Sequence, residues 1–151
     1  MKFLAPLIVA ALVVTAIACG SSPTAPSTLN LTGTWIGVGR DAQGAETFRW
    51  VVTQTGDRIS GQAILDPVDP RDGSCGSCHK RTNGTLSGTL SGGALTLALD
   101  FPAGGADITS LCGITMRAST TDVATGRIAA SYTGTTTCEG LITDGTLTVT
   151  R

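Results

Sequence analysis

Charged residues are scarce in this chain of 151 residues, at 14%, and aromatic residues are scarcer still, at 4%. So few charges disfavour long solvent-facing helices, which draw on Glu, Lys and Arg. The formal net charge is −1 and the sequence has no Lys/Arg cluster, so no nucleic acid is expected as a partner. Glycine, at 20 residues, and threonine are abundant instead, and this composition favours short strands and turns.

The familiar catalytic motifs are also missing. The sequence has no Gly-x-Ser-x-Gly, no phosphate-binding glycine loop and no His-Glu-x-x-His. Its single histidine is His79, so a Ser-His-Asp triad would have to be built on that residue. Carboxylates such as Asp100, Asp107 and Glu139 are suited to acid–base chemistry, but no pattern singles them out. We therefore expect a protein that is not an enzyme.

An apolar run occupies most of residues 1–18 and follows a single positive charge at Lys2. The run is shorter than the ~20 residues of a membrane-spanning helix, and no second run of that length follows. Residues 1–18 are therefore predicted to be an export signal. The sequence AIACG at residues 16–20 resembles the lipobox of bacterial lipoproteins, in which the signal is cut before the cysteine. This resemblance implies a lipoprotein signal peptide and lipidation at Cys19.

The segment after the cut has almost nothing to bury. Residues 19–30 (CGSSPTAPSTLN) are predicted to be the lipidated cysteine and a flexible tether, and residues 31–151 to be the folded domain. Gly20 follows the cysteine where an Asp would signal inner-membrane retention, so the resemblance implies the outer membrane. We expect a protein of the cell envelope that contacts the membrane through its lipid anchor.

From residue 31 onward, apolar and polar residues alternate with a period of two, as in Leu95, Leu97, Leu99 and Phe101. Turn-forming residues separate the alternating segments, and none of the gaps has the length of a crossover helix. Eight strands are predicted, near residues 32–40, 46–55, 58–65, 82–90, 94–101, 110–119, 125–135 and 144–151. The expected fold class is all-β, a single antiparallel up-and-down β-barrel of about eight strands.

The two ends of the domain carry a further signal. The first predicted strand begins Leu-Thr-Gly-Thr-Trp, with Gly33 and Trp35, and the last ends at Arg151. Gly-x-Trp on the first strand, with a basic residue closing the last, resembles the calycins, the family of lipocalin and avidin barrels. The resemblance implies that the Trp35 ring plugs the barrel floor and that the Arg151 guanidinium stacks over it.

Four cysteines remain if Cys19 is acylated, and an even number in an exported protein indicates two disulfides. Four cysteines allow three pairings. Cys112 falls on the sixth predicted strand and Cys138 just after the seventh, so these two are placed to meet across neighbouring strands. That pairing would leave Cys75 to bond with Cys78.

The sequence CGSCH at residues 75–79 resembles the haem-attachment motif of c-type cytochromes. The resemblance implies a covalently bound haem c on Cys75 and Cys78, with His79 as one axial ligand. The second ligand would be Met116 or a non-standard donor, because no other histidine exists. The motif leads toward a strand rather than a helix, and few aromatics are available to bury a porphyrin. A disulfide between the two cysteines is the main interpretation, zinc or another metal a lesser one, and no cofactor is expected.

These patterns lead to a functional hypothesis with two alternatives. We expect a membrane-anchored, extracytoplasmic and non-catalytic binding module for a small apolar ligand in the barrel mouth, or for an envelope partner at the loop of residues 66–84. The first alternative is a mono-haem electron-transfer or haem-sensing protein. The second is a purely structural envelope module with a filled interior. The sequence does not indicate the oligomeric state.

Overall fold

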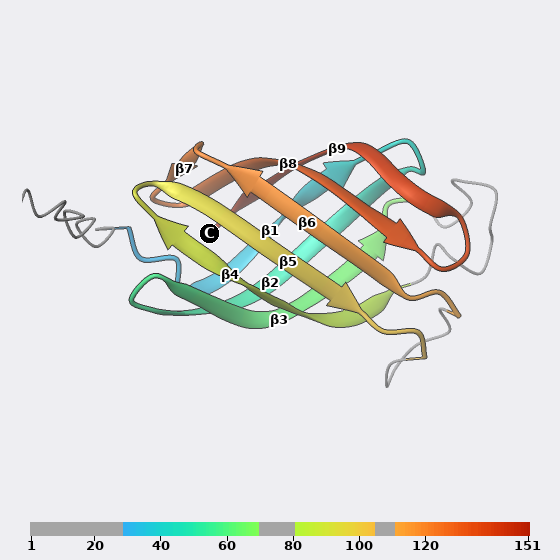
Figure 1. The fold of residues 1–151 in the computed structure, drawn as a ribbon, viewed down its shortest axis with the longest axis horizontal. Coiled ribbons are helices and arrows are strands. Elements are labelled where there is room, and N and C mark those ends of the chain that lie inside the picture. The colour runs from blue at the N-terminus through green and yellow to red at the C-terminus, as the bar shows by residue number, and fades with distance from the viewer. Residues whose placement is uncertain (1–28, 70–80, 105–110) are drawn as a thin grey trace, which may run out of the picture.

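The structure is a computed structural model, and it describes residues 29–69, 81–104 and 111–151. Within these ranges the regular structure is entirely β, in one antiparallel sheet (Figure 1). The strands are β1 (Gly33–Arg40), β2 (Ala45–Thr55), β3 (Arg58–Pro67), β4 (Thr82–Ser91), β5 (Ala94–Phe101), β6 (Ile114–Thr120), β7 (Val123–Ala124), β8 (Arg127–Thr136) and β9 (Gly140–Thr150).

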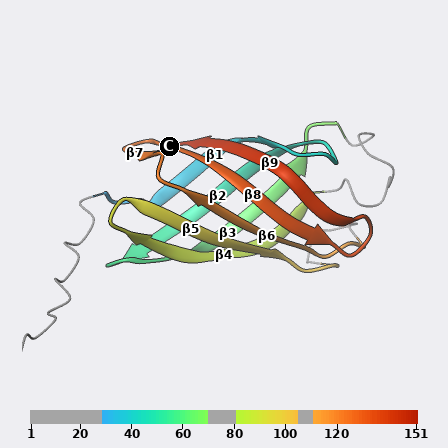
Figure 2. The same ribbon diagram turned by 45° about the horizontal axis from the view of Figure 1, so that its top comes forward.

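The sheet closes on itself. Strands β1 to β6 pair in chain order, each with its neighbour. β9 pairs with both β1 and β8, and the pairing of β6 with β8 completes the ring. Eight strands therefore form a closed up-and-down barrel, and the short β7 is an additional strand beside β8 (Figures 1 and 2). This confirms the predicted all-β, antiparallel barrel of about eight strands, an architecture consistent with a calycin-like fold.

The alternating strand directions place the connections at two ends (Figure 1). We call the end where β1 begins and β9 ends the floor, and the opposite end the upper end. The described segments at the floor that join two strands are short, at residues 56–57, 92–93, 121–122 and 125–126. The upper end carries residues 41–44, 68–81, 102–113 and 137–139, of which 70–80 and 105–110 lie outside the described residues.

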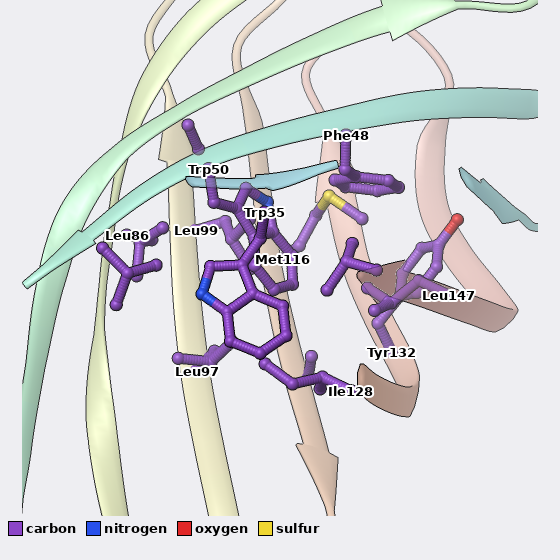
Figure 3. Close-up of a cluster of buried hydrophobic side chains, with 14 of the residues drawn as sticks. Trp35, Phe48, Trp50, Leu86, Leu97, Leu99, Met116, Ile128, Tyr132 and Leu147 are labelled. Atoms are coloured by element: carbon purple, nitrogen blue, oxygen red, sulfur yellow. The ribbon is translucent and has the colours of Figure 1, made fainter. Parts of the chain in front are cut away.

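Alternate residues on each strand point inward and fill the barrel. The buried hydrophobic residues form one cluster of 21 side chains, none more than 5% exposed. Figure 3 shows Trp35, Trp50, Met116 and Leu147 converging from four different strands. Such burial is the principal stabilising contribution to a domain with few charged residues.

Glycines allow the strands to bend into so small a barrel. A Cβ added to Gly37 would collide with the carbonyl oxygen of Thr148 on β9, and one added to Gly134 would collide with that of Thr115 on β6. Neighbouring backbones therefore approach at these points more closely than any side chain permits. The abundance of glycine inside strands follows from this curvature.

Two predicted strand boundaries near the upper end were wrong. β6 begins at Ile114, so Cys112 precedes the strand instead of lying on it. The predicted strand at 125–135 corresponds to β8, and the short β7 that pairs with it was not predicted. β9 begins at Gly140 instead of near residue 144, and Asp144 lies inside the strand with a φ of 57°. The β8–β9 register shifts there, as in a β-bulge, which tolerates the same left-handed backbone as a turn.

Candidate functional site

The floor is built around Trp35, a fully buried residue of β1. Its Nε1 donates a hydrogen bond to the carbonyl oxygen of Leu31, 2.8 Å away. The guanidinium carbon of Arg151 lies 5.3 Å from the centroid of the indole ring, which is a cation–π contact. Gly33 has a φ of 141°, and a Cβ there would lie 3.0 Å from Cδ of Arg151. Gly33, Trp35 and Arg151 are thus brought together at the floor in the arrangement that the resemblance to calycins implies.

The chain that enters β1, residues 29–32, is fastened to the same end. Arg151 Nη1 donates to the carbonyl oxygens of Thr32 at 2.8 Å and Asn30 at 3.1 Å. The side chain of Gln54, near the end of β2, accepts a hydrogen bond from the Leu31 amide at 2.7 Å and donates to the carbonyl of Leu29 at 3.1 Å. The first and last described residues of the domain are therefore held together at the floor.

The upper end is held by a disulfide. Cys112 and Cys138 are bonded, with their Cα atoms 5.6 Å apart, which confirms this predicted pair. Next to it, Gly113 and Thr137 extend the pairing of β6 and β8 beyond the strands: the Gly113 amide donates to Thr137 Oγ1 at 3.0 Å, and the Thr137 amide donates to the Gly113 carbonyl at 2.9 Å. The bond thus joins residues 102–113 to residues 137–139.

A second contact at the upper end joins β8 to the turn between β1 and β2. Tyr132 is buried on β8, and its hydroxyl donates to Oδ2 of Asp41 at 2.8 Å. Burial, and then the hydrogen bond and negative charge of Asp41, raise the pKa of Tyr132 well above its ordinary value. The other oxygen of Asp41 accepts the amide of Gln43 at 2.7 Å, which fixes the turn. The Tyr132 ring also packs edge-on against Phe48.

The barrel interior leaves little room for a ligand in the described part of the chain. A cavity of ligand size would leave the inward-facing side chains partly accessible to water, yet Trp35, Phe48 and Phe101 are 0% exposed. Met116, the methionine considered as a haem ligand, belongs to this packed interior and is 3% exposed. It faces the other core side chains rather than solvent (Figure 3).

Hollows are found instead on the outside of the barrel. One shallow groove of about 540 Å³ crosses β5, β6, β8 and β9, and its lining includes Asp100, Arg117 and Leu141. Another, of about 420 Å³, lies beside β1 near the upper end and is lined in part by Val38 and Val68. These grooves are open surfaces suited to contact with a large partner rather than enclosed sites for a small molecule.

The remaining residues singled out in the sequence lie outside the described residues. They are Cys19, Cys75, Cys78 and His79. Within residues 29–69, 81–104 and 111–151, no group of three His, Cys, Asp or Glu side chains is gathered that could hold a metal ion. The same residues contain no helix of the length and apolarity needed to cross a bilayer.

Three residues that organise the two ends were not identified from the sequence. Gln54 closes the floor, and Asp41 and Tyr132 close the upper end. Tyr132 falls within the strand predicted at 125–135, but the partner of its hydroxyl lies 91 residues away in the chain. No local pattern marks such a pair. Searches of family models, curated proteins and solved structures find no match to this chain.

Proposed function

We propose that this chain is a lipid-anchored, non-catalytic protein of the cell envelope, whose barrel binds an envelope partner through its outer surface. The observation that carries the choice of surface is the packing of the interior, where 21 hydrophobic side chains are each at most 5% exposed. A filled barrel is a rigid support, and function on such supports resides in surface grooves and connecting loops. The outer grooves and the long upper connections supply both.

The floor supports the anchored half of the proposal. The proposed lipid site, Cys19, precedes the first described residue by ten positions. Residues 29–32 are then tied to the barrel by Gln54 and Arg151, so a pull on the tether acts on the floor. The upper end is the one opposite the proposed tether, so we expect a partner to be bound there or in the outer grooves. We place the protein at the outer membrane on the basis of Gly20.

The intact mass of the exported chain tests the anchor. A mature lipoprotein would begin at Cys19 and carry the mass of a diacylglycerol group and a further acyl chain, and Cys19→Ala would remove this mass and the membrane association. An exported chain that begins elsewhere and carries no acyl mass would refute the anchor. A Cys75→Ser/Cys78→Ser chain is the matched control, because it loses two other cysteines and keeps Cys19.

A small apolar ligand is the competing occupant. Three buried polar atoms, Trp50 Nε1, Thr82 Oγ1 and Asn83 Oδ1, have no hydrogen-bond partner within the described residues, so a ligand that reached them would find polar contacts. Melting in the presence of fatty acids and of hydrophobic dyes distinguishes the two. We expect the melting temperature of a filled barrel to stay the same. A melting temperature that rises with ligand concentration would favour the internal site.

The haem alternative fits the described residues poorly. Met116, the methionine that would complete the iron coordination, is packed in the core. Its departure would open a cavity there. Expression in a host that matures c-type cytochromes gives a direct test: a mass increased by one haem, with a Soret band, would make electron transfer the leading function.

A purely structural role is the remaining alternative. Photo-crosslinkers placed at Leu141 in the outer groove and at Leu111 at the upper end, both highly exposed, would report any partner in living cells. We expect a discrete crosslinked species from at least one of them. No crosslink from either position would favour the structural role.

A further inference from the structure

Exposed hydrophobic side chains gather on one outer face of the barrel. Six large hydrophobic residues are exposed within the described residues, and four of them follow β1, β2 and the end of β3. These four, with the half-buried Ile64, are here called the β1–β2 face: Ile36, Val38, Val51, Val68 and Ile64. Such clustering, unlike scattered exposed hydrophobics, is typical of a contact surface.

The strand register makes this face continuous from the floor to the upper end. Val51 lies opposite Thr34 near the floor, and Ile36 lies opposite Arg49 one row further along β1. Val38 follows two residues later, and Val68 lies beside the start of β2, where its amide donates to the Ala45 carbonyl at 2.9 Å. Val38 and Val68 line the same shallow groove.

The opposite side of the barrel differs sharply in composition. The outward and exposed positions of β4, β5, β6 and β8 are mainly hydroxyl residues: Thr85, Ser87, Thr89, Thr96, Thr115, Ser119, Ser131, Thr133 and Thr135. Two cross-strand pairs, Thr89–Thr96 and Thr115–Thr135, are hydrogen-bonded through their Oγ1 atoms at 2.9 Å. That side is suited to water, so the apolar character of the β1–β2 face is local.

Charge on the β1–β2 face favours an anionic surface. Arg40 and Arg49 are both outward and exposed on β1 and β2, and neither is ion-paired in the part of the chain that the structure describes. Their aliphatic stems can lie along the apolar residues while the guanidinium groups reach phosphates. Asp66, outward on β3, is an opposing carboxylate, and it is only half-exposed.

The position of the tether indicates what covers this face. Residues 29–32 lead directly into β1, the strand that bears Ile36 and Val38. The nine residues between Cys19 and residue 29 would span about 17 Å as a flexible coil. A barrel on so short a tether meets the bilayer at an effective concentration near the millimolar range, so even a weak contact would be occupied.

We propose that the β1–β2 face rests on the phospholipid surface to which Cys19 anchors the chain. Ile36, Val38 and Val51 reach the interface, Arg40 and Arg49 contact anionic headgroups, and the hydroxyl-rich side faces solvent. This inference rests on the proposed lipid anchor. It adds an orientation: the barrel lies on its side, which leaves the groove lined by Arg117 and Leu141 accessible to a partner.

Cysteine accessibility tests the orientation. Val38→Cys and Leu141→Cys place a thiol near the upper end on the two different sides, at positions that are 58% and 73% exposed. Both are made in a Cys75→Ser/Cys78→Ser chain, in which Cys19 is acylated and Cys112 bonded to Cys138. Reaction with a water-soluble polymer-linked maleimide is timed for acylated protein on vesicles of phosphatidylethanolamine and phosphatidylglycerol. The reference is the same variant with Cys19→Ala, free in buffer.

We expect V38C to react about tenfold more slowly on vesicles than in buffer, and L141C to react at nearly the same rate in both. Equal rates for V38C in the two states would overturn the inference. So would slowing of V38C in vesicle-free buffer that increases with protein concentration, because a second copy would then be the occupant. Unchanged melting of both variants would show that the barrel is intact.

The mass of each exported chain separates this inference from the proposed anchor. Absence of the acyl mass would refute the proposed function itself. Acylated protein whose V38C and L141C thiols react equally fast on vesicles would refute only the orientation. As a second measurement, Arg40→Gln/Arg49→Gln should reduce the protection of V38C on anionic vesicles and leave L141C unaffected.

Discussion

The two ends of the barrel are closed by different kinds of interaction. At the floor, short turns join the strands, and side chains hold the backbone of residues 29–32 through hydrogen bonds from Gln54 and Arg151. At the upper end, the connections 68–81 and 102–113 are much longer. Among the described residues, that end is held by the Cys112–Cys138 disulfide and by the buried hydrogen bond between Tyr132 and Asp41. The floor is therefore closed by hydrogen bonds to the backbone, whereas the described part of the upper end is joined by a covalent bond and a side-chain hydrogen bond.

The two ends therefore hold different parts of the chain. The floor joins the two termini of the domain, because Arg151 contacts the residues that precede β1. If Cys19 is anchored as proposed, a terminus fixed in this way would transmit the restraint of the tether to the barrel. At the other end, the disulfide holds Cys112 against Cys138, next to the start of β6 and the end of β8. Variants at each end should therefore have separate effects on stability.

The largest effect is expected from Trp35→Ala. The substitution removes a fully buried indole, its hydrogen bond to Leu31 and the cation–π contact with Arg151. We expect the free energy of unfolding to fall by about 4 kcal/mol. Urea denaturation measures it, with Trp35→Phe as the control that keeps a ring. A loss below about 1 kcal/mol would show that the floor is not closed by this residue.

Removal of the disulfide should have a slightly smaller effect, located at the other end. A bond that closes a separation of 26 residues contributes about 3 kcal/mol in the chain-entropy model. Cys112→Ser/Cys138→Ser should therefore lower stability by about that amount. Hydrogen exchange should rise at Gly113 and Thr137 but not at Leu31, whose amide is held at the floor. Faster exchange at Leu31 to the same extent would contradict the independence of the two ends.

The sequence was sufficient to predict the barrel because binary alternation repeats in every strand. It also placed Cys112 and Cys138 near each other, since neighbouring strands bring distant residues into contact. It could not distinguish a turn from a bulge at Asp144, because both use a left-handed backbone. Whether the barrel is hollow was equally out of reach, because the interior depends on how side chains from eight strands fill one volume.

Contacts between distant polar residues were the other part that the sequence could not supply. Gln54 bonds to residues more than 20 positions away, and nothing in its neighbours distinguishes it from an ordinary polar residue near a strand end. Tyr132 has the inward phase of β8, which predicts burial but says nothing of Asp41. Hydrogen bonds of this kind follow from the closed fold and do not help to predict it.

A smaller effect is expected from Arg151→Met, which keeps an apolar stem over Trp35 but removes the guanidinium. The two carbonyl contacts and the cation–π contact together should contribute about 1.5 kcal/mol at this exposed position. Hydrogen exchange at Leu31 should rise, while exchange at Gly113 at the upper end should not. Arg151→Lys is the matched control, and it should recover part of the stability because the cation remains.

The smallest effect at neutral pH is expected from Tyr132→Phe, at about 1 kcal/mol, because one hydrogen bond to Asp41 is lost.

The pH dependence of stability gives a sharper test of Tyr132 at high pH. The pKa of Tyr132 is raised in the folded barrel, so the unfolded chain releases this proton first, near the ordinary tyrosine value of about 10. The free energy of unfolding is unaffected by this proton below that value and falls as the pH rises above it, by about 1.4 kcal/mol per pH unit. Tyr132 is the only tyrosine, so absorbance titration reports it alone. Subtracting the stability–pH profile of Tyr132→Phe removes the contribution of every other titrating group. An absorbance titration of the folded protein with a midpoint near pH 10 would contradict the buried pair of Tyr132 and Asp41.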